Sequence, residues 1–415
     1  MKGKAAGAGI GSPQVALTEL CLSSIVPSTM RYAFRLAELL GHTPDRRKRP
    51  GTIKAIVEHT GLDRHQVAAL LKNEAKYIPL EALSRICDYL IDHGHATADQ
   101  LPGALFAIQP ESFWELLARR RSVEICVGVR QGEGAETPEN AWVVASDSVL
   151  VGELLSGVTT VGGVAKHRAR RPGQTTTSKH EEAPPQPERL QQTLTWSPGQ
   201  VSIEDAQSRA QEVFQAFSDD AGDKALVCIG SVKSNPVVEL VFADAFGSQP
   251  FTSEDSVQTA ADRTCPFFLR YRDHDPKPGA ASAGIRLSKT EPAEQPGFYY
   301  EQDDGTWVWA GGGKGHDAAL VFYIFREPLG RLEMVLSGFS GRATRLLAKT
   351  LAFRSEEFWP PVYSESSVSI GAFIVKYETD PEEHQSTSLL QTDVSAAARI
   401  FPISGEAIRR RMERV

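Results

Sequence analysis

The stretch IKAIVEHTGLDRHQVAALLKN, residues 53–73, predicts two short helices that meet at a sharp turn. Gly61 stands at the turn, where the chain requires a left-handed backbone conformation that glycine adopts without steric cost. Asp63 is placed to cap the second helix. Apolar side chains recur on one side of each helix, namely Ile53, Ile56 and Val57 on the first and Val67, Leu70 and Leu71 on the second.

The second helix presents an outward face of short or polar side chains, which are suited to reach base edges in a DNA major groove. This face consists of Arg64, His65, Gln66, Ala69, Lys72 and Asn73. Two further helices are predicted beside the pair, one over residues 29–40 and one over residues 79–94. Together these segments predict an all-α helix-turn-helix bundle over residues 29–105.

The segment from Met30 to Asp92 resembles the Cro-type, phage-repressor-like helix-turn-helix family of transcriptional regulators. The resemblance implies that the helix after Asp63 is the recognition helix and that double-stranded DNA is the partner. It also implies that Arg64, His65, Gln66 and Ala69 read bases, whereas Lys72, Asn73, Lys76 and Tyr77 lie near the DNA backbone. A plain helical bundle with a glycine-containing turn, serving as a protein-binding module, is the alternative.

The connection HTPDRRKRPG, residues 42–51, is longer and more basic than is usual in that family. Its charged residues are candidate phosphate contacts or, alternatively, solvated loop charges. The candidates in and next to this loop are Arg46, Arg47, Lys48, Arg49 and Thr52.

Charge is unevenly distributed along the chain. The whole sequence has a formal net charge of −7, but residues 30–92 hold 11 basic and 8 acidic side chains, a net charge of +3. A basic module on an acidic remainder is typical of a DNA-binding domain attached to another domain. The overall net charge of −7 argues against a protein that coats nucleic acid indiscriminately.

The bulk composition excludes several classes of protein. An apolar share of 41% and a charged share of 23% are those of a globular protein. No apolar run is long enough for a membrane span or a signal peptide, so we expect a cytoplasmic location. The five cysteines are widely spaced and form no CxxC pair, so neither a disulfide framework nor a zinc site is expected.

The rest of the chain predicts a second, larger domain. Residues 1–28 are expected to be a flexible tail, and residues 166–199, rich in Pro, Thr, Gln and charge, a linker or disordered insertion. Strand and helix patterns alternate over residues 106–165 and 200–415, as in KALVCIGSVKSNPVVELVFADAF and GRLEMVLSGFSGRATRLLAKTLA. This order predicts a Rossmann-like α/β domain with a mixed or parallel sheet, acting as a ligand-sensing or assembly domain.

Three strand-to-helix junctions in this domain carry small or polar residues. Such junctions let backbone N–H groups approach an anion at a helix start, although capping alone also explains them. Because ligands of open α/β sheets bind beyond the carboxyl ends of the strands, the junctions are the candidate ligand site. The candidates are Gly230, Ser231, Ser234 and Asn235, then Gly338, Ser340, Gly341 and Thr344, and finally Asp147 with Ser148.

The sequence shows no convincing catalytic or cofactor motif. GxxxxGK[ST] is absent, and neither IGSVKSN nor SGFSGRA completes GxGxxG. Asp273, His274 and Asp275 stand together in RYRDHDPKPG, where a polar turn is the favoured interpretation over a metal site. We therefore expect no catalytic residues, no metal and no cofactor.

Three functional hypotheses follow. The leading one is a transcriptional regulator whose α/β domain senses an anionic, nucleotide-like or phosphorylated effector, with the chain acting as a homodimer or in a larger DNA-bound complex. The second is a nucleotide-processing enzyme targeted by its helix-turn-helix module, with Asp147, Glu239 and Asn235 as the residues to test. The third is an adaptor that binds other proteins in a DNA-bound complex.

Overall fold

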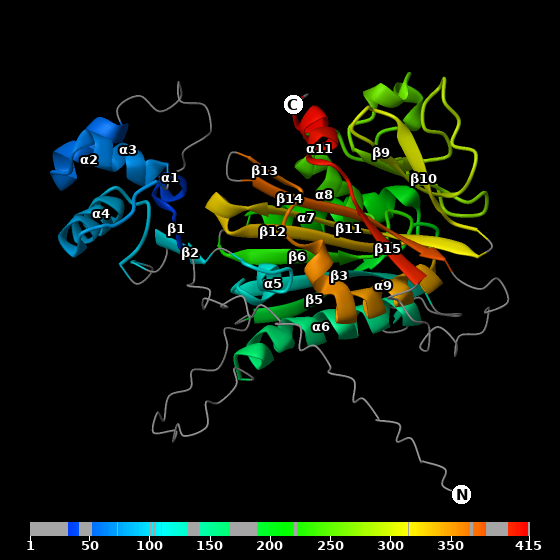
Figure 1. Ribbon diagram of the computed structural model, residues 1–415, viewed down its shortest axis with the longest axis horizontal. Helices are drawn as coiled ribbons and strands as arrows, with labels where there is room; N and C mark the ends of the chain where they lie inside the picture. Colours follow the sequence, from blue (N-terminus) through cyan, green and yellow to red (C-terminus); the bar gives the residue numbers. More distant parts are fainter. Residues whose placement is uncertain are drawn as a thin grey trace, which may run out of the picture.

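The computed structural model describes residues 32–40, 52–72, 74–98, 101–102, 105–108, 110–131, 141–166, 189–219, 222–313, 315–365, 368–378 and 397–413. A small helical bundle stands beside a much larger α/β body (Figure 1). The tail expected over residues 1–28, the basic loop 42–51, Asn73 and residues 167–188 lie outside the described residues.

The bundle has the helix-turn-helix arrangement that the sequence predicts. Helices α2 (Thr52–Thr60) and α3 (Arg64–Leu71) meet at Gly61, whose φ of +66° is the left-handed conformation expected there. Helix α4 (Leu80–Asp92) packs against α2. The three helices share a buried apolar core that includes Ile56, Val67, Leu70, Ile86 and Leu90.

The prediction of a helix over residues 29–40 is wrong for residues 32–34. Residues Tyr32–Phe34 form strand β1, which pairs antiparallel with β2 (Phe106–Ile108), and helix α1 covers only Leu36–Leu39. The Phe34 ring packs edge-on against Phe106, with ring centroids 5.5 Å apart. Pairing with a segment more than 70 residues away therefore overrides the local helical pattern, as tertiary contacts often do.

Within the described residues, nine strands form the main sheet of the body. Four central strands run parallel in the order β12, β6, β3 and β5, whereas β11, β14, β15 and β13 add antiparallel neighbours beyond β12, and β4 pairs antiparallel with the end of β3. The sheet is thus mixed, and a Rossmann-like arrangement is not confirmed. The strands are β3 Ser122–Gln131, β4 Ala141–Val143, β5 Arg189–Trp196, β6 Lys224–Ile229, β11 His316–Arg326, β12 Arg331–Gly338, β13 Tyr363–Glu365, β14 Val368–Glu378 and β15 Ala398–Pro402.

The prediction that residues 166–199 form a linker or disordered insertion is wrong for strand β5. Its residues pair parallel with β3, from Arg189 opposite Ser122 to Trp196 opposite Val129. β5 pairs with no other described strand, and its side chains Leu190 and Leu194 are 53% and 45% exposed. A strand that is half solvated tolerates polar residues, and so its composition looked like that of a linker.

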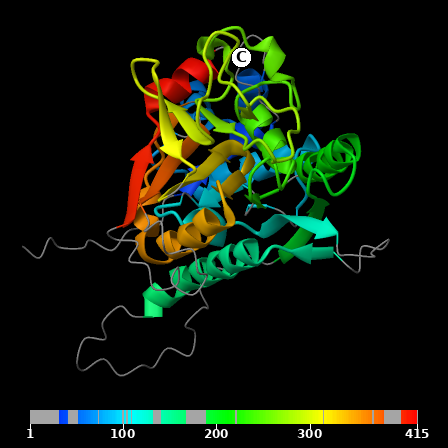
Figure 2. The same ribbon diagram turned by 90° about the vertical axis from the view of Figure 1, so that its right-hand side faces the viewer.

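Helices cover both faces of the main sheet. One face packs against α5 (Glu115–Ala118), α6 (Ala145–Lys166) and α9 (Gly341–Arg354), and the other against α7 (Ile203–Asp219), α8 (Val237–Ala245) and α11 (Gly405–Met412). Figure 2 shows α6 and α9 below the sheet and α11 above it. The central strands are buried on both sides, because their alternate side chains enter the two apolar cores.

A second, four-stranded sheet lies against the face that carries α8 and α11, and the sequence analysis did not predict it. Its order is β10, β9, β7 and β8, and its aromatic residues Phe267 and Phe298 belong to the same apolar core as α8. Arg411 of α11 pairs with Glu301 of this sheet at 2.8 Å. The strands are β7 Phe267–Arg270, β8 Ala283–Gly284, β9 Gly297–Glu301 and β10 Trp307–Gly311.

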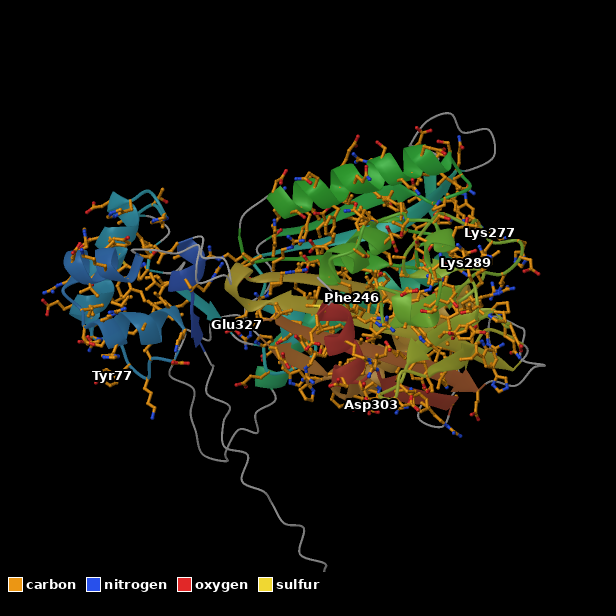
Figure 3. The ribbon with its side chains drawn as sticks, turned by 90° about the horizontal axis from the view of Figure 1, so that it is seen from above. Tyr77, Phe246, Lys277, Lys289, Asp303 and Glu327 are labelled. Carbon is orange, nitrogen blue, oxygen red and sulfur yellow. The ribbon has the colours of Figure 1, made fainter. Side chains whose placement is uncertain are left out.

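The bundle and the carboxyl ends of the parallel strands lie at opposite ends of the body. Helix α1 contacts the short turn Glu327–Leu329, which precedes the start of β12. Figure 3 shows Glu327 next to the bundle and Lys277 at the far end. No helix in the described part of the chain combines the length and hydropathy that a bilayer span needs.

Glu239 on α8 predicts a pH dependence of stability. This carboxyl group is fully buried, accepts hydrogen bonds from the Ala281 N–H at 2.6 Å and from the Ser282 hydroxyl at 2.7 Å, and has a pKa raised to about 7 by burial. The native state therefore holds a proton that the unfolded chain loses near pH 4.5. The free energy of unfolding should fall by about 3 kcal/mol as the pH rises from 4.5 to 7.

Urea unfolding at pH 5 and pH 8 measures this fall, and Glu239→Gln, which cannot ionise, should remove most of Glu239's share of it. An equal pH dependence in the variant and the wild-type protein would contradict the assignment.

Candidate functional site

Helix α3 begins with a capping box. The Asp63 carboxylate accepts a hydrogen bond from the His65 N–H at 2.6 Å, and the Gln66 side-chain oxygen accepts one from the Asp63 N–H at 3.1 Å. These bonds satisfy two of the N–H groups that a helix start leaves without partners. Asp63 is therefore the cap that the sequence predicts, and Gln66 has a structural contact besides its predicted role in reading bases.

The outer face of α3 is open to solvent. Arg64, His65 and Gln66 are exposed, and Ala69 is half-buried. Figure 3 shows Tyr77 at the surface of the bundle. Of the other predicted DNA contacts that the structure describes, Lys72, Lys76 and Tyr77 are exposed and Thr52 is half-buried. The polar side of the helix is thus not closed off by the body, as entry into a DNA groove requires.

Residues 46–91 match the Cro/C1-type HTH DNA-binding domain. The family resemblance predicted for this part of the chain is confirmed, and the match supports a DNA-binding regulator of transcription. The match ends before the α/β body. No curated protein and no solved structure matches the chain.

The net positive charge of the segment from Met30 to Asp92 depends on one basic run. Arg46, Arg47, Lys48 and Arg49 supply 4 of the 11 basic residues between Met30 and Asp92, and without them acidic residues outnumber basic ones by 8 to 7. The match of the family model begins at Arg46, so this basic run belongs to the DNA-binding domain.

At the opposite end of the body, a cavity of 450 Å³ opens at the carboxyl ends of β3, β6 and β12. We call it the carboxyl-edge cavity. All three predicted strand-to-helix junctions contribute to its wall, as expected for parallel strands that end at one edge. The predicted residues in the wall are Asp147, Gly230, Ser231, Ser234, Gly338, Ser340, Gly341 and Thr344.

Two predicted ligand residues lie outside this wall. Ser148 is exposed on α6. Asn235 is fully buried, where its amide donates to the backbone oxygens of Cys126 at 3.0 Å and Ile229 at 3.2 Å. Asn235 therefore joins β3, β6 and the start of α8, and its role is structural.

The β6–α8 junction forms a tight loop in the wall. Gly230 has a φ of +99°, and a Cβ there would stand 2.4 Å from the Ser234 hydroxyl oxygen, so a side chain does not fit. The Ser234 hydroxyl accepts from the Ser231 N–H at 3.2 Å and donates to the Ser231 carbonyl oxygen at 3.1 Å. The Ser231 side chain is 4% exposed, and its hydroxyl has no protein partner.

Positive charge gathers around Phe339 in the same cavity. The Lys233 ammonium lies 4.4 Å from the Phe339 ring centroid, 2.8 Å from its carbonyl oxygen and 3.1 Å from the Asp275 carboxylate. The Arg272 guanidinium lies 4.5 Å from the same ring. Burial lowers the pKa of Lys233, although Asp275 opposes the shift. Burial raises the pKa of Asp275, but Lys233 and Arg272 together hold that pKa below its ordinary value.

Asp147, in the first turn of α6, is the second carboxyl group in the wall. It is buried and accepts a hydrogen bond from the Ser146 hydroxyl at 3.1 Å. Burial raises its pKa, against the effects of that hydrogen bond and of Arg130. Arg130, at the end of β3, lines the cavity as well.

Sequence reasoning missed the cationic part of the site. The segment RYRDHDPKPG was interpreted as a polar turn, and it follows β7 of a sheet that was not predicted. In the fold it contributes Arg272, His274 and Asp275 to the cavity. No three His, Cys, Asp or Glu side chains of the described residues are grouped so that they hold a metal ion.

The residues named for the enzyme hypothesis do not meet. Asp147 lines the cavity, whereas Glu239 and Asn235 are fully buried outside its wall. Glu239 faces the Ala281–Ser282 backbone instead. The described residues therefore assemble no catalytic group from this set.

Two substitutions at Gln66 distinguish its predicted role in reading bases from its role in the capping box. Gln66→Ala should lower the free energy of unfolding of the HTH domain by about 0.5–1 kcal/mol, whereas Gln66→Glu should not, because glutamate also completes a capping box. Both variants, and Arg64→Ala, should lose about 1–3 kcal/mol of affinity for duplexes that the wild-type chain selects from a random pool. Lys289→Ala, which removes a charge from the body, is the control. Unchanged selection in Arg64→Ala would contradict the recognition-helix assignment.

Replacing Arg46, Arg47, Lys48 and Arg49 together by glutamine should weaken DNA binding and flatten its salt dependence. Each lost phosphate contact lowers the slope of log K against log salt by about 0.9. Fluorescence anisotropy titrations at several salt concentrations measure this slope. An unchanged slope would instead identify these residues as solvated loop charges.

Proposed function

We propose that this chain is a DNA-binding transcriptional regulator whose α/β body binds a phosphate-bearing effector in the carboxyl-edge cavity. The observation that carries the proposal is a buried hydroxyl without a protein partner, Ser231, in a wall that also holds Lys233, Arg272 and Arg130. An effector phosphate supplies oxygen acceptors for all four groups, since charged donors prefer such acceptors.

The first turns of α6 and α9 also favour an anion in the cavity. The cavity wall contains the first residues of α9, Gly341 and Thr344, and of α6, Ser146 and Asp147. Backbone N–H groups at helix starts carry partial positive charge and favour a bound anion. Ser340 caps α9 through the Ala343 N–H at 3.2 Å, so this part of the wall is preformed.

Effector binding is proposed to alter DNA binding through the Lys233–Asp275 pair. A phosphate in the cavity competes with Asp275 for the Lys233 ammonium, and so changes how the turn at residues 272–276 is held. Strands β3, β6 and β12 begin at the end of the body near the bundle and end at the cavity, which gives a continuous connection between the two sites. The effector shifts the DNA affinity only if its own affinity differs between the DNA-bound and the DNA-free form of the chain.

We further propose that the chain binds DNA as a homodimer. One HTH module buries little surface on DNA, and two modules on adjacent half-sites raise affinity and specificity together. Analytical ultracentrifugation of the full chain with and without a selected duplex tests the stoichiometry. A single chain on each duplex would overturn this part of the proposal.

Lys233→Ala should weaken the binding of inorganic pyrophosphate, measured by calorimetry, by roughly tenfold or more, because a hydrogen bond to a charged group contributes about 1.5–3 kcal/mol. Burial lowers the Lys233 pKa, so wild-type affinity should decline at a lower alkaline pH than an ordinary lysine predicts. Lys277→Ala is the matched control, since Lys277 follows Pro276 but lies outside the cavity wall.

Equal losses in Lys233→Ala and Lys277→Ala would point to diffuse surface charge rather than a built site. The proposal also requires that a ligand of the cavity changes the affinity for selected DNA. Genome-wide mapping of bound DNA then identifies the regulated process, and a chain that binds no specific sequence would overturn the regulator function.

A further inference from the structure

A large aromatic side chain stands exposed beside the carboxyl-edge cavity. Trp142 on β4 is 46% exposed, although tryptophan is among the side chains whose burial contributes most to stability. It is the direct register partner of Arg130, which lines the cavity, and side chains of opposite residues in an antiparallel pair project from the same face. Trp142 is not part of the cavity wall itself, but its ring centroid lies 5.8 Å from the guanidinium of Arg130, which is.

The cavity is larger than a phosphate group requires. Its volume of 450 Å³ lies in the range of about 300–1,000 Å³ that accommodates small organic ligands. The groups suited to a phosphate, Ser231, Lys233 and Arg272, occupy the part formed by the β6–α8 junction and the turn after β7. The remaining wall, towards Arg130 and Gln200, leads to β4 and hence to Trp142.

We propose that the effector is a nucleotide whose phosphate lies against Ser231 and Lys233 and whose base stacks on Trp142. This inference rests on the proposed function, because it specifies the effector of the same cavity. Every base has a flat π-face, and stacking on an exposed aromatic ring is a common way in which proteins hold bases. The sugar then spans the wall between the two groups.

Arg130 is suited to change partners when such a ligand binds. Its distance from the Trp142 ring is near the outer limit of about 6 Å for a cation–π contact, so little is lost when the contact breaks. The guanidinium is exposed at the cavity wall, within the reach of a phosphate oxygen that enters the site. The ring face that it leaves becomes available to the base.

Further polar side chains belong to the same cavity wall. Gln200, His274 and Asp147 all line the cavity and carry groups that donate or accept hydrogen bonds. Burial raises the pKa of Asp147, which favours its protonated form relative to an ordinary aspartate and lowers its repulsion of an anionic ligand. These side chains are the ones that would distinguish one base from another.

The test compares ligands that differ by the base. Inorganic pyrophosphate, ribose 5-phosphate and the four nucleoside 5′-monophosphates are titrated by calorimetry into the full chain. At least one nucleotide should bind roughly 5- to 150-fold more tightly than ribose 5-phosphate, as expected for one base–aromatic stack. Trp142→Ala should remove this advantage while leaving ribose 5-phosphate binding unchanged, and Trp142→Phe should retain most of it.

Phe353→Ala is the matched control, because Phe353 is an exposed aromatic residue on α9 away from the cavity wall. It should leave nucleotide affinity unchanged. If ribose 5-phosphate binds as tightly as every nucleotide, or if Trp142→Ala keeps the advantage, the nucleotide inference fails while the phosphate-binding cavity stands. If none of these probes binds, the proposed effector site fails as well.

Discussion

The parallel pairing of β12, β6, β3 and β5 is the constraint on which the rest of the body depends. Parallel neighbours cannot be joined by tight turns, so the chain crosses over the sheet through helices and all four strands end at one edge. That edge gathers junctions from residues as far apart in sequence as Arg130 and Thr344. The antiparallel strands on the other side of β12 widen the sheet without adding to this edge.

Buried polar groups lie at both ends of the parallel strands. At the bundle end, Arg120 contacts Asp223 and donates to the Gly330 carbonyl oxygen at 3.2 Å, and the buried Glu333 pairs with both Arg326 and Arg331. These groups hold the framework and have partners within the protein. At the cavity end, Ser231 has none. The Ser231 hydroxyl is the group of the cavity wall that the proposed effector would satisfy.

Sequence patterns predicted the features that depend on local chemistry. Gly61, Asp63 and the apolar spacing of residues 53–73 are sufficient for the helix-turn-helix, because the turn, the cap and the packed faces all lie within one short segment. The buried strands β3, β6 and β12 were recognisable from their largely apolar sequences. The three junctions that line the carboxyl-edge cavity were recognisable because small or polar residues follow β4, β6 and β12.

Features that depend on distant partners escaped prediction. MRYAFRLAELL has a helical pattern, yet Tyr32–Phe34 is a strand because β2 pairs with it. The composition of β5 is that of a linker, and its strand identity comes from the neighbouring β3. Likewise, nothing next to Arg272 or Trp142 in the sequence indicates that either lies at the edge where β3, β6 and β12 end.

The short β1–β2 pairing has a mechanical consequence. It ties the strand that enters the bundle to the strand that leaves it, so the three HTH helices are fastened at a single stem. Helix α1 also contacts the turn Glu327–Leu329, so the stem and this contact together hold the HTH helices against the body. A change in the position of the turn Glu327–Leu329 would therefore move the HTH helices relative to the body.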